Sequence, residues 1–341
     1  MTKATTPAGN GGGRSLSSDH AILALDLGAS RIRAAVVLAD GSLAARAEGI
    51  TRAVDGPAAV IADAVALLSE VRAGVPDRQR RRIRAIGISA PGPLDPHRGW
   101  LIEPPNLGPG FRDVAFAEPI GAALGLPAVL ERDTNVALLG ELAHGAARGM
   151  SDALYLTVST GIGGAIVAGG RLLGGPDGVA GELGHILVDL DGPACGCGAR
   201  GHLEALSSGV AIARDAKAAI VAGAAPGLAD LQRRLGAPLS ARDVAAAEEA
   251  GDAAAGAIMD RARSAFAAAL VGLVNTFAPE VVVVGGSVAR GQGDRWLDPA
   301  REAVSRFAFR VPAARVRIVQ ASLGDDVGLV GALALVAARL G

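Results

Sequence analysis

The sequence of 341 residues has very little cysteine: only Cys195 and Cys197, which are separated by one residue. Such a pair makes a poor disulfide framework, so a reducing, cytoplasmic location is expected. The N-terminal residues lack the apolar run of a signal peptide, and no later stretch is apolar over the length of a membrane span. The sequence therefore predicts neither a secreted disulfide-rich protein nor a membrane protein.

An excess of charge of one sign is also missing, because 33 basic residues nearly balance 34 acidic ones. The basic run at residues 78–84 is interpreted as a solvated helix end or loop before a strand. Neither nucleic acid nor a membrane surface is expected as a partner. With 50% hydrophobic residues the chain can bury a large core, and its length favours two domains after a disordered tail at residues 1–20.

The same pattern of elements occurs twice. Residues 21–48 consist of an apolar run, a Gly/Ser turn, a second apolar run, an Asp-Gly turn and a weaker third strand. Residues 153–175 repeat this order with a Gly/Ser/Thr-rich turn and a Gly-Gly turn. The sequence therefore predicts an internal duplication of a three-stranded meander.

Helices and strands alternate over the rest of the chain, which predicts an α/β fold. Helical periodicity or apolar strand character indicates helices at 57–71, 135–146, 258–277 and 325–340, and strands at 84–94, 126–132 and 281–285. Two related α/β halves usually leave a cleft between them, into which polar residues at strand ends point. Function is expected in that cleft.

Three Gly-rich turns follow apolar strands, at residues 26–30, 159–164 and 285–291. Such turns can direct backbone N–H groups at an anion. None matches the P-loop or a complete G-x-G-x-x-G motif, and each alone is as well explained as an ordinary hairpin turn. Two of them, however, occupy equivalent places in the repeat, and the first begins with Asp26, a carboxylate suited to Mg²⁺ beside nucleotide phosphates.

From about Ile22 to its C-terminus the sequence resembles the ROK family of repressors and sugar kinases. The resemblance implies an actin-like, ribonuclease H-like ATPase fold with duplicated βββαβα units: a smaller domain of residues 21–131 plus 325–341, a larger one of 132–324, and a cleft between them. It implies ATP and Mg²⁺ as cofactors and a homodimer. The residues it places at the nucleotide are Asp26, Gly28, Ser30, Ser159, Thr160, Gly161, Gly285 and Gly286.

The segment ERDTNVALLGE, residues 131–141, resembles the catalytic segment of this family. The resemblance makes Asp133 the general base that takes the proton of the attacked sugar hydroxyl. A carboxylate at a strand end in a cleft is chemically suited to that role. The alternative is that Asp133 only caps the following helix.

The segment from Gly184 to Glu204 gathers both cysteines and two histidines. His185, Cys195, Cys197 and His202 are residue types that bind zinc, and they resemble a ROK signature in which His202 here replaces a third cysteine. Four protein ligands leave no open position, so we expect structural Zn²⁺ that fastens the loop. The alternative is an unoccupied loop with two buried thiols.

The resemblance also implies a set of sugar-binding residues: Asn106, Arg132, Glu182, His185 and Glu204, with the Pro91-Gly92 turn as a pocket wall. His185 then serves both zinc and sugar. Arg132 departs from the family pattern, which has Asn there. Since Arg can only donate hydrogen bonds, it either contacts the substrate or turns away to a carboxylate; Glu103 or Glu131 is the expected partner.

The leading functional hypothesis is an ATP-dependent kinase for the 6-hydroxyl of a hexose, with glucose as first candidate. Alternatives are a kinase for an N-acetylated hexosamine or fructose, polyphosphate as donor, and a sugar-binding regulator without its DNA-binding domain. A winged helix-turn-helix would need more than the roughly twenty residues before the first strand. An actin-like assembly protein would require neither Asp133 as a base nor a zinc-fastened loop.

Overall fold

The computed structural model describes residues 20–341, so the predicted disordered tail lies outside the described residues except for His20. The first sheet has the strand order β3-β2-β1-β4-β8. Its strands are β1 (Ala21–Leu27), β2 (Arg31–Leu38), β3 (Leu43–Ile50), β4 (Ile83–Ala90) and β8 (Ala128–Arg132). The meander β1 to β3 is antiparallel, whereas β4 and β8 are added in parallel.

The second sheet has the order β11-β10-β9-β12-β13, which is the same topology. Its strands are β9 (Ala153–Val158), β10 (Ile162–Ala168), β11 (Arg171–Leu172), β12 (Val281–Gly285) and β13 (Arg317–Gln320). The predicted duplication is thus confirmed. A small antiparallel sheet of β5 (Leu94–Asp95), β6 (Trp100–Leu101) and β7 (Val114–Ala115), which sequence analysis missed, extends the first half.

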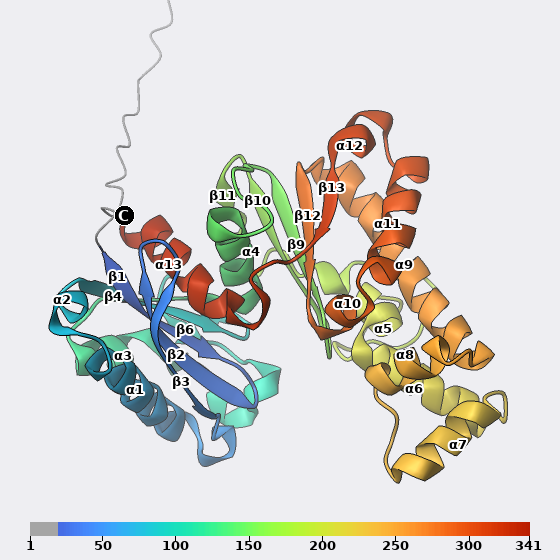
Figure 1. Ribbon diagram of the computed structural model, residues 1–341, viewed down its shortest axis with the longest axis horizontal. Helices are drawn as coiled ribbons and strands as arrows, with labels where there is room; N and C mark the ends of the chain where they lie inside the picture. Colours follow the sequence, from blue (N-terminus) through green and yellow to red (C-terminus); the bar gives the residue numbers. More distant parts are fainter. Residues whose placement is uncertain (1–19) are drawn as a thin grey trace, which may run out of the picture.

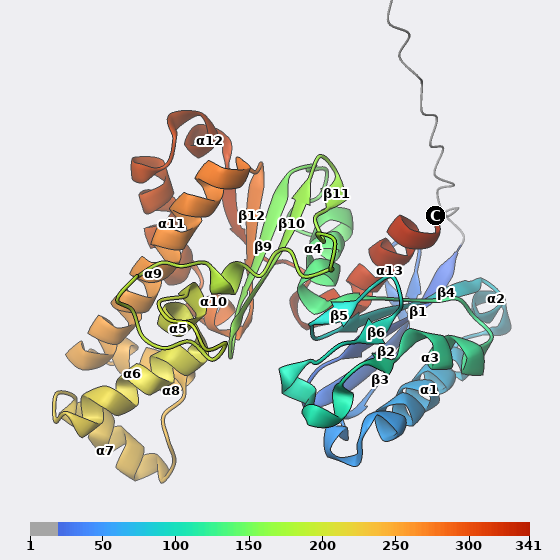
Figure 2. The same cartoon turned by 180° about the vertical axis from the view of Figure 1, so that it is seen from behind.

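Helices connect and cover these strands (Figures 1 and 2). They are α1 (Pro57–Ala73), α2 (Asp77–Arg80), α3 (Ala117–Leu124), α4 (Asp133–His144), α5 (Leu203–Ser207), α6 (Gly209–Val221), α7 (Pro226–Leu235), α8 (Ala241–Glu249), α9 (Ala253–Phe277), α10 (Ser287–Gln292), α11 (Asp294–Phe307), α12 (Arg310–Arg315) and α13 (Val327–Leu340). The predicted helices and strands are present within a few residues of their expected ends. The basic run at 78–84 is α2 and the start of β4, as expected.

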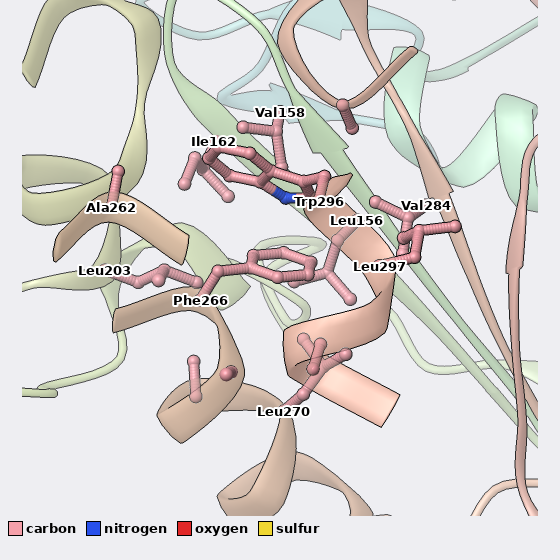
Figure 3. Packing of buried hydrophobic residues seen from close by; sticks show 14 of the residues in the cluster. Leu156, Val158, Ile162, Leu203, Ala262, Phe266, Leu270, Val284, Trp296 and Leu297 are labelled. Carbon is pink, nitrogen blue, oxygen red and sulfur yellow. The ribbon is translucent and has the colours of Figure 1, made fainter. Parts of the chain in front are cut away.

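Successive side chains along a strand point to opposite faces of its sheet. Because the buried strands are apolar on both faces, helices cover both sides of each sheet. On β1, Leu23 and Leu25 pack in the core beneath α1, while Ile22 and Ala24 pack against α13. On β12, Val282 and Val284 join the core built by α9 and α11, where Phe266 and Trp296 meet at a centroid distance of 5.6 Å (Figure 3). The opposite face of this second sheet packs on α4.

Helices α4 and α13 lie side by side between the two sheets (Figures 1 and 2). Their close approach depends on glycine, since a Cβ on Gly331 would lie 2.1 Å from the carbonyl oxygen of Val136. Buried Glu141 fixes the crossing by accepting hydrogen bonds from Ala146 N, Ser322 N and Leu323 N at 2.7–3.0 Å. Among the described residues, no helix is both long and apolar enough to span a membrane.

Candidate active site

The first turn, residues 28–30, joins β1 to β2 and places Asp26 at the end of a buried strand. The carboxylate of Asp26 accepts a hydrogen bond from Ser89 Oγ at 2.8 Å and forms an ion pair with Arg33, its cross-strand neighbour. Ser30 is exposed at the turn, and Gly28 N donates to Arg31 O at 2.8 Å. Arg33 was missed by sequence analysis, although antiparallel pairing across a three-residue turn places it opposite Asp26.

The second turn consists of Ser159, Thr160 and Gly161, because β10 already begins at Ile162. Its backbone oxygens accept hydrogen bonds from the start of α6, with Gly209 N to Ser159 O at 2.8 Å and Val210 N to Thr160 O at 3.2 Å. A turn held in this way can present its remaining polar groups to an anion without reorganising.

The third turn is shorter than sequence analysis predicted, since residues 287–292 form helix α10. Gly286 has φ of +92°, and a Cβ there would lie 2.3 Å from Val158 O, so only glycine fits. Ser287 N donates to Ser159 Oγ at 2.9 Å, which joins the second and third turns.

A pocket of about 850 Å³ opens beside these two turns, between α6, α8 and α10. Its lining includes Ser159, Thr160, Ser287 and Arg290, but neither Gly285 nor Gly286. This volume lies within the range of small-molecule and cofactor sites. Arg290, also missed by sequence analysis, pairs with Asp325 at 2.7 Å, and Arg33 donates to Asp325 O at 2.5 Å.

Asp133 is the first residue of α4 rather than its N-cap, which is Arg132. Its side chain is accessible to solvent, yet the surrounding protein displaces enough water for desolvation to raise the pKa of Asp133 to about 6. A hydrogen bond from Thr134 N lowers this pKa, as does the charge of Arg132, while the charges of Asp26 and Glu182 raise it. Asp26, just before the first turn, and Glu182 therefore both act electrostatically on Asp133.

Arg132 is buried, with 3% of its side chain exposed, and forms an ion pair with Glu182. It also donates to Ala180 O at 2.5 Å, and the Gly92 turn packs against its side chain. The expected pairing with Glu103 or Glu131 is therefore wrong. Glu103 pairs with Arg112, and Glu131 is satisfied by Arg339 and Asn135, so Glu182 is the carboxylate left to face Arg132.

The four predicted zinc ligands come together on the segment between β11 and α5. Their ligand atoms all lie within 4.8 Å of one another. Cys195 Sγ is 3.7 Å from His185 Nδ1, and Cys197 Sγ is 3.4 Å from His202 Nδ1. Tetrahedral zinc requires sulfur and nitrogen ligands about 3.5 Å apart, so these two distances and the types of the four ligands are compatible with zinc.

The remaining predicted sugar contacts occupy different positions. Glu182 directly precedes the short helix η4 (Leu183–His185), and 46% of its side chain is exposed. Glu204 lies in the first turn of α5 and accepts a hydrogen bond from Ile162 N at 2.8 Å. Asn106 is exposed in the short helix η2 (Pro105–Leu107) between β6 and β7.

The chain is similar in sequence and fold to known sugar kinases. The model of the ROK family matches residues 22–339. A glucokinase from Halalkalibacterium halodurans is 33% identical over 318 residues, covering 92% of this chain and 94% of that protein. An N-acetylmannosamine kinase from Shigella flexneri is 34% identical over 316 residues, with 92% and 97% covered. The crystal structure of a ROK family glucokinase from Streptomyces griseus, in complex with glucose and AMPPNP, is 30% identical, with a TM-score of 0.72 and coverage of 92% and 98%.

Proposed function

The chain belongs to the ROK family, and from this membership we propose that it is an ATP-dependent sugar kinase acting on the 6-hydroxyl of a hexose, with glucose as first candidate. The observation that carries the proposal is the position of Asp133. A carboxylate with a pKa of about 6 stands at the start of α4, electrostatically coupled to Asp26 of the first turn and to Glu182. This is the pKa range in which a carboxylate is an effective base and is still ionised near neutral pH.

In the proposed reaction, the sugar 6-hydroxyl oxygen forms a bond to the γ-phosphorus of ATP while the bond to the β,γ-bridging oxygen breaks and ADP leaves. Asp133 accepts the hydroxyl proton. Catalysis of this kind rests on positioning and charge neutralisation. Two arginines supply positive charge: Arg33 beside Asp26 near the first turn, and Arg290 in the pocket beside the second and third turns.

We propose that the nucleotide occupies the 850 Å³ pocket, with its phosphates at the first and second turns. Ser159, Thr160 and Ser287 contribute directly to the lining, while Gly161, Gly285 and Gly286 provide close backbone packing. Bound Mg²⁺ would neutralise phosphate charge. Both oxygens of Asp26 already have partners, Ser89 and Arg33, which favours contact with Mg²⁺ through water.

The sugar is proposed to contact Glu182, His185, Glu204 and Asn106, with Arg132 acting through Glu182. Carboxylates suit a polyol because each hydroxyl needs an acceptor, and an unpaired buried group is costly. His185, Cys195, Cys197 and His202 would hold structural zinc that fixes the loop carrying these residues.

The first test is a coupled ADP-release assay with glucose, N-acetylmannosamine, N-acetylglucosamine and fructose, using ATP and then polyphosphate as donor. N-acetylmannosamine is the strongest competitor, since a relative of that name is as similar as the glucokinase. We expect turnover with ATP and the highest kcat/KM for glucose. Sugar and nucleotide binding without turnover would instead indicate a regulator.

We further propose that the cleft separates a domain of residues 21–131 plus 325–341 from one of residues 132–324. The first sheet, with α13 packed against it, and the second sheet support this division. The homodimer implied by family resemblance is testable by sedimentation, and the cytoplasmic location by cell fractionation.

A further inference from the structure

One contact of Glu204 is not explained by sugar binding. Its Oε2 accepts a hydrogen bond from the backbone N–H of Ile162 at 2.8 Å. Ile162 directly follows the second turn, and a Cβ on Gly161 would lie 2.4 Å from the same oxygen. The carboxylate therefore rests against the main chain of the turn proposed to hold phosphate, and it reaches this position because Gly161 has no side chain.

Residues 184–204 carry the four potential zinc ligands and form the zinc loop. The N-terminal end of this loop also contacts Ile162. A Cβ on Gly184 would lie 1.9 Å from the carbonyl oxygen of Ile162, so Gly184 packs directly on it. Gly184 precedes the ligand His185, and Glu204 follows the ligand His202 by two residues. The two ends of the loop are joined to each other by Leu203 N, which donates to Ile186 O at 3.0 Å.

Ile162 is thus held on its N–H side by Glu204 and on its carbonyl side by Gly184. The turn before it is also closed from within, because Ser159 N donates to Gly161 O at 2.9 Å. A hydrogen bond from a backbone N–H to a carboxylate is stronger than one to a neutral acceptor. The zinc loop and the second turn are therefore mechanically connected through Glu204.

We propose that Glu204 is a positioning residue for the second turn, through which the zinc loop supports nucleotide binding as well as sugar binding. The inference rests on the proposed function only in taking ATP as the ligand of that turn. Electrostatics alone predicts the opposite effect, since a carboxylate beside phosphates repels them. A loss of nucleotide affinity on removing Glu204 would therefore report the hydrogen bond and not the charge.

Three substitutions separate the hydrogen bond from the charge. Glu204→Gln keeps an acceptor of the same length without the charge, Glu204→Asp keeps the charge but withdraws the acceptor from Ile162 N, and Glu204→Ala removes both. Binding of AMPPNP with Mg²⁺ is measured calorimetrically on zinc-loaded protein without sugar. We expect Glu204→Ala and Glu204→Asp to bind about threefold to tenfold more weakly than Glu204→Gln, which should match wild type.

Glu182→Gln is the matched control, because Glu182 is proposed to contact sugar and lies at the opposite end of the loop. It should leave AMPPNP affinity unchanged while weakening glucose binding. Removing zinc from wild type with a chelator should weaken AMPPNP binding by about the same factor as Glu204→Ala does. Removing zinc from Glu204→Ala should weaken AMPPNP binding little further, if zinc and Glu204 act through the same contact.

The inference is overturned if all three Glu204 variants bind AMPPNP like wild type and lose only glucose, or if all three weaken it equally. Should Glu204→Ala fold poorly, the comparison of Glu204→Asp with Glu204→Gln still decides. Because the measurement uses nucleotide alone, it is independent of turnover. A wild-type protein that binds AMPPNP but phosphorylates no sugar would refute the proposed function and leave this inference intact.

Discussion

The two halves of the molecule share one strand order but carry different chemistry at equivalent positions. Asp26 pairs with Ser89 on β4, and the corresponding pairing on β12 joins Thr157 to Gly285. Across the meander, Asp26 faces Arg33 whereas Thr157 faces Gly163. At these equivalent positions the first half therefore has a pair of charged side chains, whereas the second half has uncharged residues.

The second half has instead gained structure between its third and fourth strands. The zinc loop and helices α5 to α9 occupy residues 173–280, where the first half has α1 and α2. This addition builds the 850 Å³ pocket and the metal cluster. The comparison indicates that the duplicated scaffold is shared and that its specialisation is local: an ion pair at the end of β1 in the first half, and a pocket and a cluster of potential metal ligands in the second.

The sharpest test of this division is Asp133→Asn, since Asp133 follows the last strand of the first sheet. Asparagine keeps the size of the side chain but cannot accept the proton. Turnover should fall by roughly two to four orders of magnitude, while AMPPNP binding, for which no base is needed, should be retained. Steady-state kinetics and calorimetry provide the two measurements.

Stability offers a control for this variant. The folded pKa of Asp133 is raised above its unfolded value, so its contribution to stability is present at low pH and is lost as pH rises through about 6. Asparagine never ionises, and the variant should be at least as thermally stable as wild type at pH 7. Retention of most of the kinase rate would mean that the base lies elsewhere.

The second test removes the metal from the other half. If the proposed site holds zinc, wild type should contain about one zinc atom per chain, and Cys197→Ser should lose it, because a hydroxyl is a poor ligand beside a thiolate and two imidazoles. Glucose affinity should then decrease by roughly 10- to 100-fold. Elemental analysis and calorimetry check this, and active wild-type protein without zinc would contradict it.

The third test uses pH to distinguish the halves. The pKa of Asp133 is raised to about 6. At a pH below this value Asp133 is protonated and cannot act as a base, so kcat/KM should fall roughly tenfold per pH unit as pH decreases below 6. AMPPNP binding at the neutral second turn should follow the titration of the nucleotide alone. Kinetics with glucose from pH 5 to 8 should show the acidic limb in wild type.

The sequence predicted the duplication and the clustering of His185, Cys195, Cys197 and His202 because both are local patterns: strand periodicity with turn residues, and four potential ligands within eighteen residues. It missed α6 to α8, of which α6 and α8 are rich in alanine whereas α7 contains a single alanine. The capping box of Ser240 and Asp243 is the local signal that could have located α8. Arg290 was missed because its partner Asp325 is set by tertiary packing, whereas the position of Arg33 opposite Asp26 follows from the pairing of β1 with β2 and could have been predicted.

The partner of Arg132 shows the same limit of local inference. Glu131 is adjacent to Arg132 in sequence and Glu103 precedes it in the same half of the chain, whereas Glu182 is fifty positions away along the chain. The zinc loop brings Glu182 over the start of α4, so the pairing exists only in the folded protein. Arg132 does turn to a carboxylate, one of the two alternatives that the sequence left open, but that carboxylate is Glu182, which is itself a proposed sugar contact.

The smallest expected effect is that of Arg132→Asn, which removes the ion pair with Glu182. Without Arg132, Glu182 loses its ion-pair partner, and glucose affinity should fall by about threefold to tenfold. The pKa of Asp133 should also rise, because the charge of Arg132 lowers it and that of Glu182 raises it. The acidic limb of kcat/KM should therefore move to higher pH, an effect that loss of packing alone would not produce.

Glucose, N-acetylated hexosamines and acidic sugars distinguish an indirect from a direct role of Arg132. Its guanidinium is buried and occupied by Glu182 and Ala180 O, so affinity should fall similarly for every neutral sugar. Arg112→Asn, which breaks an exposed pair with Glu103, is the control and should change neither affinity nor pH profile. A loss confined to one class of sugar would show that Arg132 contacts the substrate itself and does not act only through Glu182.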